Sequence, residues 1–138
     1  NVALAGSGGA VDVGAQSKAD LQGIIAVANV AYRDGGAVAV NTLSEFNIYN
    51  STATANVARG RGGFAILDRV RTASLRSVVA RRNRAADQGG ALALVLCDQD
   101  PVVVTDSTFQ NNSAAHSGGA LDVQSSSLRV EGATLFTG

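Results

Sequence analysis

The sequence contains one cysteine, one proline, one histidine and no tryptophan or methionine, and aromatic residues make up only 4% of its 138 residues. The single cysteine, Cys97, excludes an internal disulfide and a thiolate metal cluster. No apolar run approaches the roughly 18 residues that a membrane-spanning helix requires. The apolar fraction of 46% is mostly Ala, Val and Leu, which predicts a narrow interior filled by small and branched side chains.

Charge is balanced, because eleven basic and eleven acidic residues cancel. Net charge therefore gives no reason to expect a nucleic-acid partner. The length fits a single domain, residues 1–138.

Glycine pairs recur along the chain and divide it into repeats. They stand at 8–9, 35–36, 62–63, 89–90 and 118–119, so that the spacing is 27, 27, 27 and 29 residues. The repeat units are 8–34, 35–61, 62–88, 89–117 and 118–138.

Each unit carries short runs in which apolar residues alternate with variable ones. The first run follows the glycines directly, as in Val38-Ala39-Val40, and two more follow within the unit. Period-two alternation is typical of strands with one buried face, and no segment has a helical period. Three short strands per repeat predict an all-β fold, a right-handed parallel β-helix of about five coils.

Asparagine recurs in one column, at Asn1, Asn29, Asn56, Asn83 and Asn112. In stacked coils each amide donates to one coil and accepts from the next, so the column predicts an asparagine ladder at one corner. Asparagine also tolerates the left-handed backbone conformation that a corner needs. The glycine pairs mark the next corner, where a positive φ or a close backbone approach would exclude a Cβ atom.

The repeat resembles that of polymorphic outer membrane proteins, a family of surface proteins with paired GGA-[ILV] and FxxN motifs. The first motif reads GGAV at Gly8 and Gly35 and GGAL at Gly89 and Gly118, and it departs to GGFA at Gly62. The second is complete only at Phe109-Gln110-Asn111-Asn112. The resemblance implies a right-handed β-helix at a cell surface.

The fourth unit has a longer segment between its first two strands, Val95–Pro101, which contains Asp98 and Asp100. Paired carboxylates suggest an alternative function, a polysaccharide lyase or hydrolase, which would need one carboxyl protonated and the other ionised. Nothing in the sequence predicts that either is buried. A polar Asp/Pro turn is the favoured interpretation.

His116 and Cys97 each lack a neighbouring His or Cys, so we expect no metal site and no cofactor. The histidine is interpreted as a solvated turn residue. The cysteine is interpreted as a small apolar filler or an incidental thiol.

Eight of the eleven basic residues lie between Arg59 and Arg84 and predict a belt around the third coil. Such a belt favours binding of an anionic glycan or acidic protein partner, and an ordinary solvated surface is the alternative. The residues expected to bind are Arg69, Arg71, Arg76, Arg81, Arg82 and Arg84.

Two N-x-[ST] triplets, at Asn50 and Asn111, are candidate glycosylation sites on a secreted chain.

Taken together, these patterns predict a non-enzymatic extracellular or cell-surface scaffold, resembling an adhesin, that presents outward side chains to glycans or proteins. Both ends of the sequence fall within a repeat and would expose strand edges. We therefore expect neighbouring coils of a longer chain, or stacked subunits, to cover them.

Overall fold

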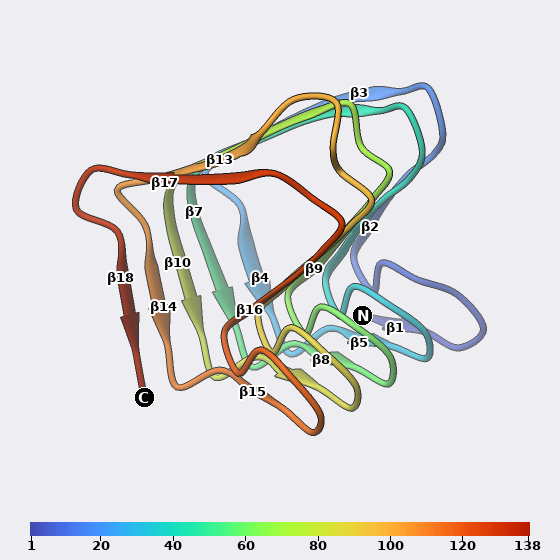
Figure 1. Cartoon of the computed structure of the whole chain (residues 1–138). Helices are drawn as coiled ribbons and strands as arrows, with labels where there is room; N and C mark the ends of the chain where they lie inside the picture. Colours follow the sequence, from blue (N-terminus) through green and yellow to red (C-terminus); the bar gives the residue numbers. More distant parts are fainter.

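The computed structural model describes all residues 1–138 and is all-β, with eighteen strands in three parallel sheets (Figure 1). The short sheet contains β1 (Val2–Ala3), β5 (Val30–Ala31), β8 (Val57–Ala58), β11 (Arg84–Ala85) and β15 (Ser113–Ala114). The glycine sheet contains β2 (Val11–Val13), β6 (Val38–Val40), β9 (Ala65–Asp68), β12 (Leu92–Val95) and β16 (Leu121–Gln124). The long sheet contains β3 (Lys18–Gln22), β4 (Ile25–Val27), β7 (Glu45–Thr54), β10 (Thr72–Arg81), β13 (Val102–Thr105), β14 (Thr108–Gln110), β17 (Leu128–Glu131) and β18 (Leu135–Thr137).

Successive coils stack in one register, which confirms the β-solenoid of about five coils. Val30 pairs with Val57, and Val57 pairs with Arg84. Residues one repeat apart in the sequence therefore lie side by side in neighbouring strands of the same sheet. In Figure 1, β4, β7, β10, β14 and β18 lie side by side in chain order. The chain has no helix that could span a membrane.

The second and third alternating runs of each repeat belong to one sheet, whereas the sequence suggested separate strands. In the second and third coils they join into β7 and β10, strands of ten residues each. Each long strand bends at a residue with positive φ, Asn50 or Ser77, and the pairing skips that residue and resumes at the next one in the same register. The third sheet is instead formed by the two residues that follow each ladder asparagine.

The interior is a single apolar column inside the three sheets. Alanine, valine and leucine dominate it as predicted, and Phe46, Phe64 and Phe109 are also fully buried. Three of the six aromatic residues of the chain therefore help to fill the interior, where smaller side chains would leave voids.

The outer face of the glycine sheet is also buried in its middle coils, contrary to the expectation of a freely variable outward position. Ala39, Ile66 and Ala93 are at most 4% exposed and form a small second cluster with Val95. A Cβ atom at Gly35 would lie 2.9 Å from Cγ2 of Ile66, so the glycine corner folds over this face. That cover is why these outward residues are apolar.

The glycine corner has the geometry that the sequence predicts. The first glycine of every pair has a positive φ, between 64° and 67°. At the second, a Cβ on Gly63 would overlap the carbonyl oxygen of Gly90 in the next coil. Both positions therefore require glycine, for two different reasons.

The asparagine ladder is present and buried. Nδ2 of Asn29 donates to Oδ1 of Asn56 at 2.8 Å, and Nδ2 of Asn83 donates to Oδ1 of Asn112 at 3.0 Å. Asn1 joins through its amino group, which donates to Oδ1 of Asn29 at 3.2 Å. Asn29, Asn56, Asn83 and Asn112 are all at most 6% exposed.

The left-handed residue at this corner is not the ladder asparagine itself but its predecessor. Ala28, Ala55, Arg82 and Asn111 have φ between 52° and 55°. The amide ladder therefore explains the asparagine column better than backbone tolerance does, since three of these four predecessors are not asparagine.

Candidate functional site

The arginines of the third coil surround it rather than gather on one face. Arg69 follows β9 and Arg71 precedes β10, at the corner between the glycine sheet and the long sheet. Arg76 and Arg81 lie exposed on β10 of the long sheet. Arg82 follows β10, and Arg84 is exposed on β11 of the short sheet.

Three of the basic side chains form ion pairs with acidic residues. Arg61 pairs with Asp34 at 3.3 Å, Arg69 with Asp68 at 3.8 Å, and Arg71 with Glu45 at 3.7 Å. Another, Arg59, lies 3.8 Å from the centre of the Tyr32 ring. Arg61, Arg69 and Arg71 therefore each have an acidic neighbour that offsets their charge, whereas Arg59 keeps its charge but is stacked on an aromatic ring.

The remaining arginines of the third coil have no acidic partner within 4.0 Å: Arg76, Arg81, Arg82 and Arg84. Two shallow hollows on the surface of the chain include three of them. The larger, of about 510 Å³, contains Arg76, and the smaller, of about 280 Å³, contains Arg81 and Arg82. We regard the larger hollow as the candidate site.

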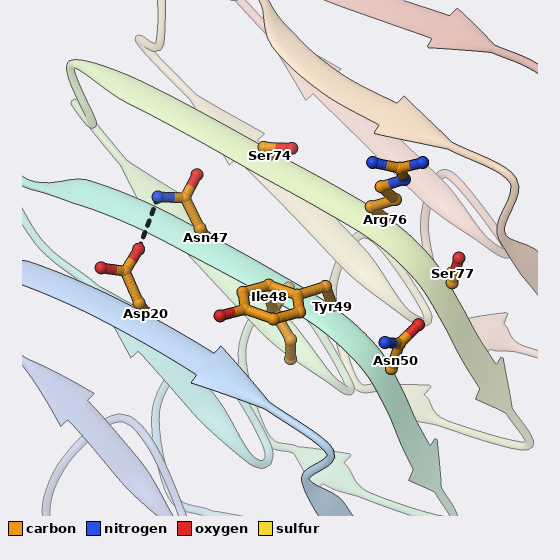
Figure 2. Close-up of a pocket in the computed structure, with 8 residues that line it drawn as sticks. All are labelled: Asp20, Asn47, Ile48, Tyr49, Asn50, Ser74, Arg76 and Ser77. Atoms are coloured by element: carbon orange, nitrogen blue, oxygen red, sulfur yellow. Dashed lines mark hydrogen bonds between the residues drawn. The ribbon is translucent and has the colours of Figure 1, made fainter.

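The candidate site lies on the outer face of the long sheet (Figure 2). Its residues come from β3, β7 and β10, at positions that alternate with buried core residues. Tyr49 stands opposite Arg76 in the strand register, and Asn47 stands between Asp20 and Ser74. The full lining is Asp20, Asn47, Ile48, Tyr49, Asn50, Ser74, Arg76 and Ser77.

Hydrogen bonding fixes only one side of the candidate site. Nδ2 of Asn47 donates to Oδ1 of Asp20 at 2.7 Å, and Lys18 Nζ lies 3.8 Å from Oδ2 of Asp20. The structure gives no hydrogen bond to the Tyr49 hydroxyl or the Arg76 guanidinium. These two groups are therefore available to a ligand.

The carboxylates of the long fourth-coil segment have no arginine within 4.0 Å. Asp98 and Asp100 are exposed in the loop between β12 and β13, and neither takes part in an ion pair. Asp106 lies at the bend of the long sheet, where its Oδ1 accepts a hydrogen bond from the backbone N–H of Ala133 at 3.0 Å. This bond gives Asp106 a structural role between coils.

Cys97 is fully buried and makes hydrogen bonds within the solenoid. Its thiol lies 3.3 Å from the carbonyl oxygen of Leu67 and 3.5 Å from that of Val95, and its backbone N–H donates to Oγ of Ser126 at 2.9 Å. Burial raises the pKa of the Cys97 thiol, so the group remains protonated. The prediction that Cys97 is a small side chain that fills the core is therefore correct, and the residue also makes hydrogen bonds that the sequence did not predict.

His116 is exposed in the turn before the last glycine pair, with Nδ1 3.2 Å from Oδ1 of Asp87. No group of three or more His, Cys, Asp or Glu side chains with metal-binding geometry is present. The two sequon asparagines, Asn50 and Asn111, are exposed at positive-φ positions, where a glycan would have room. Their use remains a prediction.

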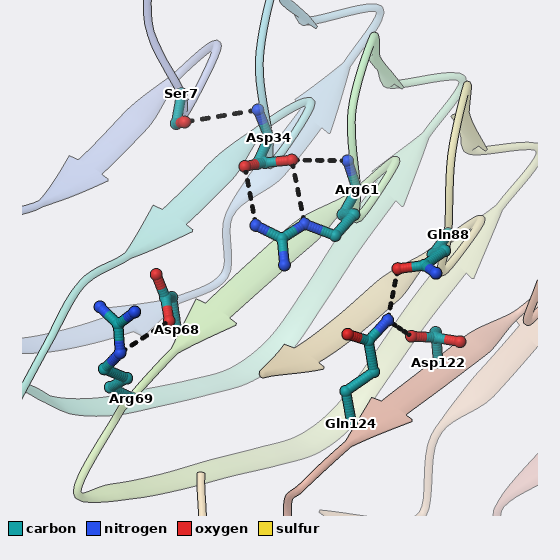
Figure 3. A network of polar contacts seen from close by, with 8 residues as sticks. All are labelled: Ser7, Asp34, Arg61, Asp68, Arg69, Gln88, Asp122 and Gln124. Atoms are coloured by element: carbon teal, nitrogen blue, oxygen red, sulfur yellow. Dashed lines mark hydrogen bonds and ion pairs between the residues drawn. The ribbon is translucent and has the colours of Figure 1, made fainter. Parts of the chain in front are cut away.

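A polar network that the sequence reasoning missed lies over the glycine sheet (Figure 3). Oδ1 of Asp34 accepts the backbone N–H of Arg61 at 2.7 Å, and the backbone N–H of Asp34 donates to Ser7 Oγ at 3.3 Å. In the last coils, Nε2 of Gln124 donates to Oε1 of Gln88 and, at 2.8 Å, to Oδ2 of Asp122. The signal was present, because a polar residue precedes every glycine pair: Ser7, Asp34, Arg61, Gln88 and Ser117.

Residues 106–124 match the family model of the Chlamydia polymorphic membrane protein repeat. No curated protein and no solved structure matches the chain. The matched segment runs from Asp106 through Asn112 and the last glycine pair, and so includes one ladder corner and one glycine corner. The match and the stacked coils together fit a β-helix protein with repeats of the polymorphic membrane protein type.

Proposed function

We propose that this chain is a non-enzymatic scaffold at a cell surface or in the extracellular space, and that it presents outward side chains to glycans or partner proteins. The observation that supports this most is the outer face of the long sheet. There, polar side chains of consecutive coils stand in register, and Arg76 and Arg81 have no acidic partner. A rigid ladder of this kind holds several contacts at fixed spacing, which reduces the entropy that binding costs.

The repeat type supports the proposed location. Its family model describes a membrane protein repeat, and the resemblance of the GGA-[ILV] and FxxN motifs is to proteins of cell surfaces. The adhesin role, the glycan partner and the glycosylation of Asn50 and Asn111 are parts of the proposal.

We also propose that further coils, from the same chain or a stacked subunit, lie against the end coils. Inward-facing residues support this, because Val123, Val130 and Phe136 are 40–46% exposed in the last coil. Their register partners one coil earlier, Leu94, Val104 and Phe109, are 0% exposed. Another coil would bury this apolar surface and pair the free strand edge.

The test of the scaffold proposal is an activity screen on acidic polysaccharides, with Asp98→Ala and Asp100→Ala as paired controls. We expect no turnover by the unmodified chain, since both carboxylates are exposed and neither has an arginine within 4.0 Å. Turnover that either substitution abolishes would overturn the scaffold proposal in favour of a polysaccharide lyase or hydrolase.

A further inference from the structure

We propose that the candidate site on the long sheet binds one acidic pyranose, a uronate unit of a polysaccharide. Tyr49 would support the sugar ring and Arg76 would hold its carboxylate. This inference rests on the proposed scaffold function and names its ligand and its site.

Tyr49 provides a flat platform on the solvent side of the sheet. Figure 2 shows its ring with one face toward the viewer, in front of Ile48, whose side chain is buried in the core. The only cation placed over an aromatic ring in the chain is Arg59, on Tyr32, so the face of Tyr49 is not covered by a guanidinium. An aromatic face is electron-rich and attracts the C–H groups on the apolar face of a pyranose.

Arg76 provides the cation at one side of this platform. It lies on the strand next to Tyr49, directly opposite it in register, and its side chain has no carboxylate within 4.0 Å. In Figure 2 its guanidinium points away from the Tyr49 ring, on the exposed side of the sheet. A guanidinium with its donors free forms a bidentate pair with a carboxylate.

Asp20 and Asn47 provide hydrogen-bond acceptors at the opposite side. Their mutual bond uses Oδ1 of Asp20 and Nδ2 of Asn47, which leaves Oδ1 of Asn47 to accept a sugar hydroxyl. Oδ2 of Asp20 lies 3.8 Å from Lys18 Nζ and retains a lone pair for a second hydroxyl. The carboxylate of Asp20 would repel a uronate carboxylate placed beside it. Lys18 offsets part of the Asp20 charge, so the direction of the ligand is set mainly by Arg76, which has no acidic partner and attracts the uronate carboxylate to its side of the site.

The size and lining of the site favour a sugar over an apolar ligand. About 510 Å³ falls within the range of small-molecule sites, and six of the eight lining residues are polar or charged. A pyranose presents hydroxyls at its edge and C–H groups on its face, as this combination of amides, a carboxylate and a tyrosine ring requires.

The test is calorimetric titration at low salt with an oligogalacturonate and with its carboxyl-reduced, neutral counterpart. The variants are Tyr49→Ala and Arg76→Gln, and the matched control is Arg84→Gln. Arg84 belongs to the same coil, is exposed and lacks an acidic partner, but it lies on the short sheet. Circular dichroism establishes that each variant is folded.

We expect the charged oligosaccharide to bind more tightly than the neutral one. Tyr49→Ala and Arg76→Gln should each weaken binding about tenfold, and Arg84→Gln less than about twofold. Equal losses in Arg76→Gln and Arg84→Gln would show a general charge effect and overturn the site. Failure of the unmodified chain to bind the oligogalacturonate would also overturn the site. Neither result would contradict the proposed scaffold function. Cleavage of the oligosaccharide during the titration would instead count against the scaffold function.

Discussion

Oδ1 of Asn83 accepts two hydrogen bonds from Asn56 in the preceding coil, from its backbone N–H at 3.0 Å and from its side-chain Nδ2 at 2.9 Å. Nδ2 of Asn83 donates in turn to the carbonyl oxygen of Ala53 in that same coil at 3.0 Å, and to Oδ1 of Asn112 in the following coil at 3.0 Å. One buried amide thus satisfies polar groups on both neighbouring coils. In a solenoid, whose stability depends on contacts between adjacent repeats, such a bridge couples each coil to the next.

Substitution of Asn83 by alanine should lower the free energy of unfolding by about 3 kcal/mol. The substitution leaves the buried backbone N–H of Asn56 without an acceptor, and such a group costs about 1–3 kcal/mol in addition to the other lost bonds. Urea denaturation followed by circular dichroism measures the change.

Asn47→Ala is the matched control for the ladder. It also removes an asparagine side-chain hydrogen bond between coils, but this bond joins Asn47 to the exposed Asp20. We expect a loss below about 1 kcal/mol. Equal losses for the two variants would contradict the special role of the buried ladder.

The coil could be predicted from sequence because its determinants are periodic. Every coil turns at the same corners and has the same backbone requirements there, so glycine pairs and asparagines recur at the spacing of the repeat. Alternation then places residues such as Val38 and Val40 inside. The corner glycines, the ladder asparagines and the alternation all follow from the backbone conformation, which is the same in every coil.

The candidate site was harder to predict because it does not repeat. Tyr49 occurs in one coil, and its register partners are Gln22 and Arg76, which pairs in turn with Thr105. Arg76 was expected to belong to a belt, but the structure distinguishes it from Arg61 and Arg71 by their acidic partners. These ion pairs depend on which side chains come into contact across neighbouring strands. The spacing of residues along the sequence does not determine those contacts.

Substitution of Gly63 by alanine should destabilise the fold by about 3 kcal/mol or more. The new Cβ would overlap the carbonyl oxygen of Gly90 and crowd the backbone of Arg84, neither of which can move without opening the stack. Thermal unfolding measures the effect.

Gly14→Ala serves as the comparison for the corner glycine, since its nearest neighbour would be Oγ of Ser17 at 3.9 Å and its φ is not positive. We expect a change within about 0.5 kcal/mol, or a slight stabilisation from reduced freedom of the unfolded chain. Equal tolerance of alanine at both glycines would show that the stack is looser than these contacts imply.

Asp34→Ala should cost about 2 kcal/mol, more than Glu45→Ala. Asp34 joins its coil to the next through the backbone N–H of Arg61 and through an ion pair whose side chains are only 21% and 27% exposed. Glu45 pairs with Lys18 at 3.9 Å and Arg71 at 3.7 Å, and all three side chains are at least 40% exposed. Exposed pairs contribute about 0–1 kcal/mol.

The effect of salt separates the two parts of the Asp34 contribution. The ion pair should weaken as sodium chloride is added, whereas the hydrogen bond to the Arg61 backbone should persist. Urea denaturation at low and high salt should therefore show a loss for Asp34→Ala that shrinks but does not vanish. A loss that disappears at high salt would contradict the role of the backbone hydrogen bond.

Alkaline pH should destabilise the chain through Cys97. Burial raises the pKa of its thiol, so the folded state keeps the proton at a pH where the unfolded state has lost it. The stabilisation is therefore fully present below the ordinary pKa of a thiol and is lost as the pH rises toward the folded value. Unfolding free energies measured across this range should decline.

Cys97→Ser is the matched control, because a serine hydroxyl does not titrate in this range and serines elsewhere in the solenoid already make equivalent bonds, one between coils and one within a coil. Oγ of Ser44 bonds to the carbonyl oxygen of Gly14 at 2.8 Å, and Oγ of Ser126 to that of Gln124 at 2.8 Å. At neutral pH we expect Cys97→Ser to change stability by less than about 1.5 kcal/mol. It should also remove the part of the alkaline decline that the thiol causes. An identical decline in both proteins would mean that other groups, and not the buried thiol, set the alkaline limit.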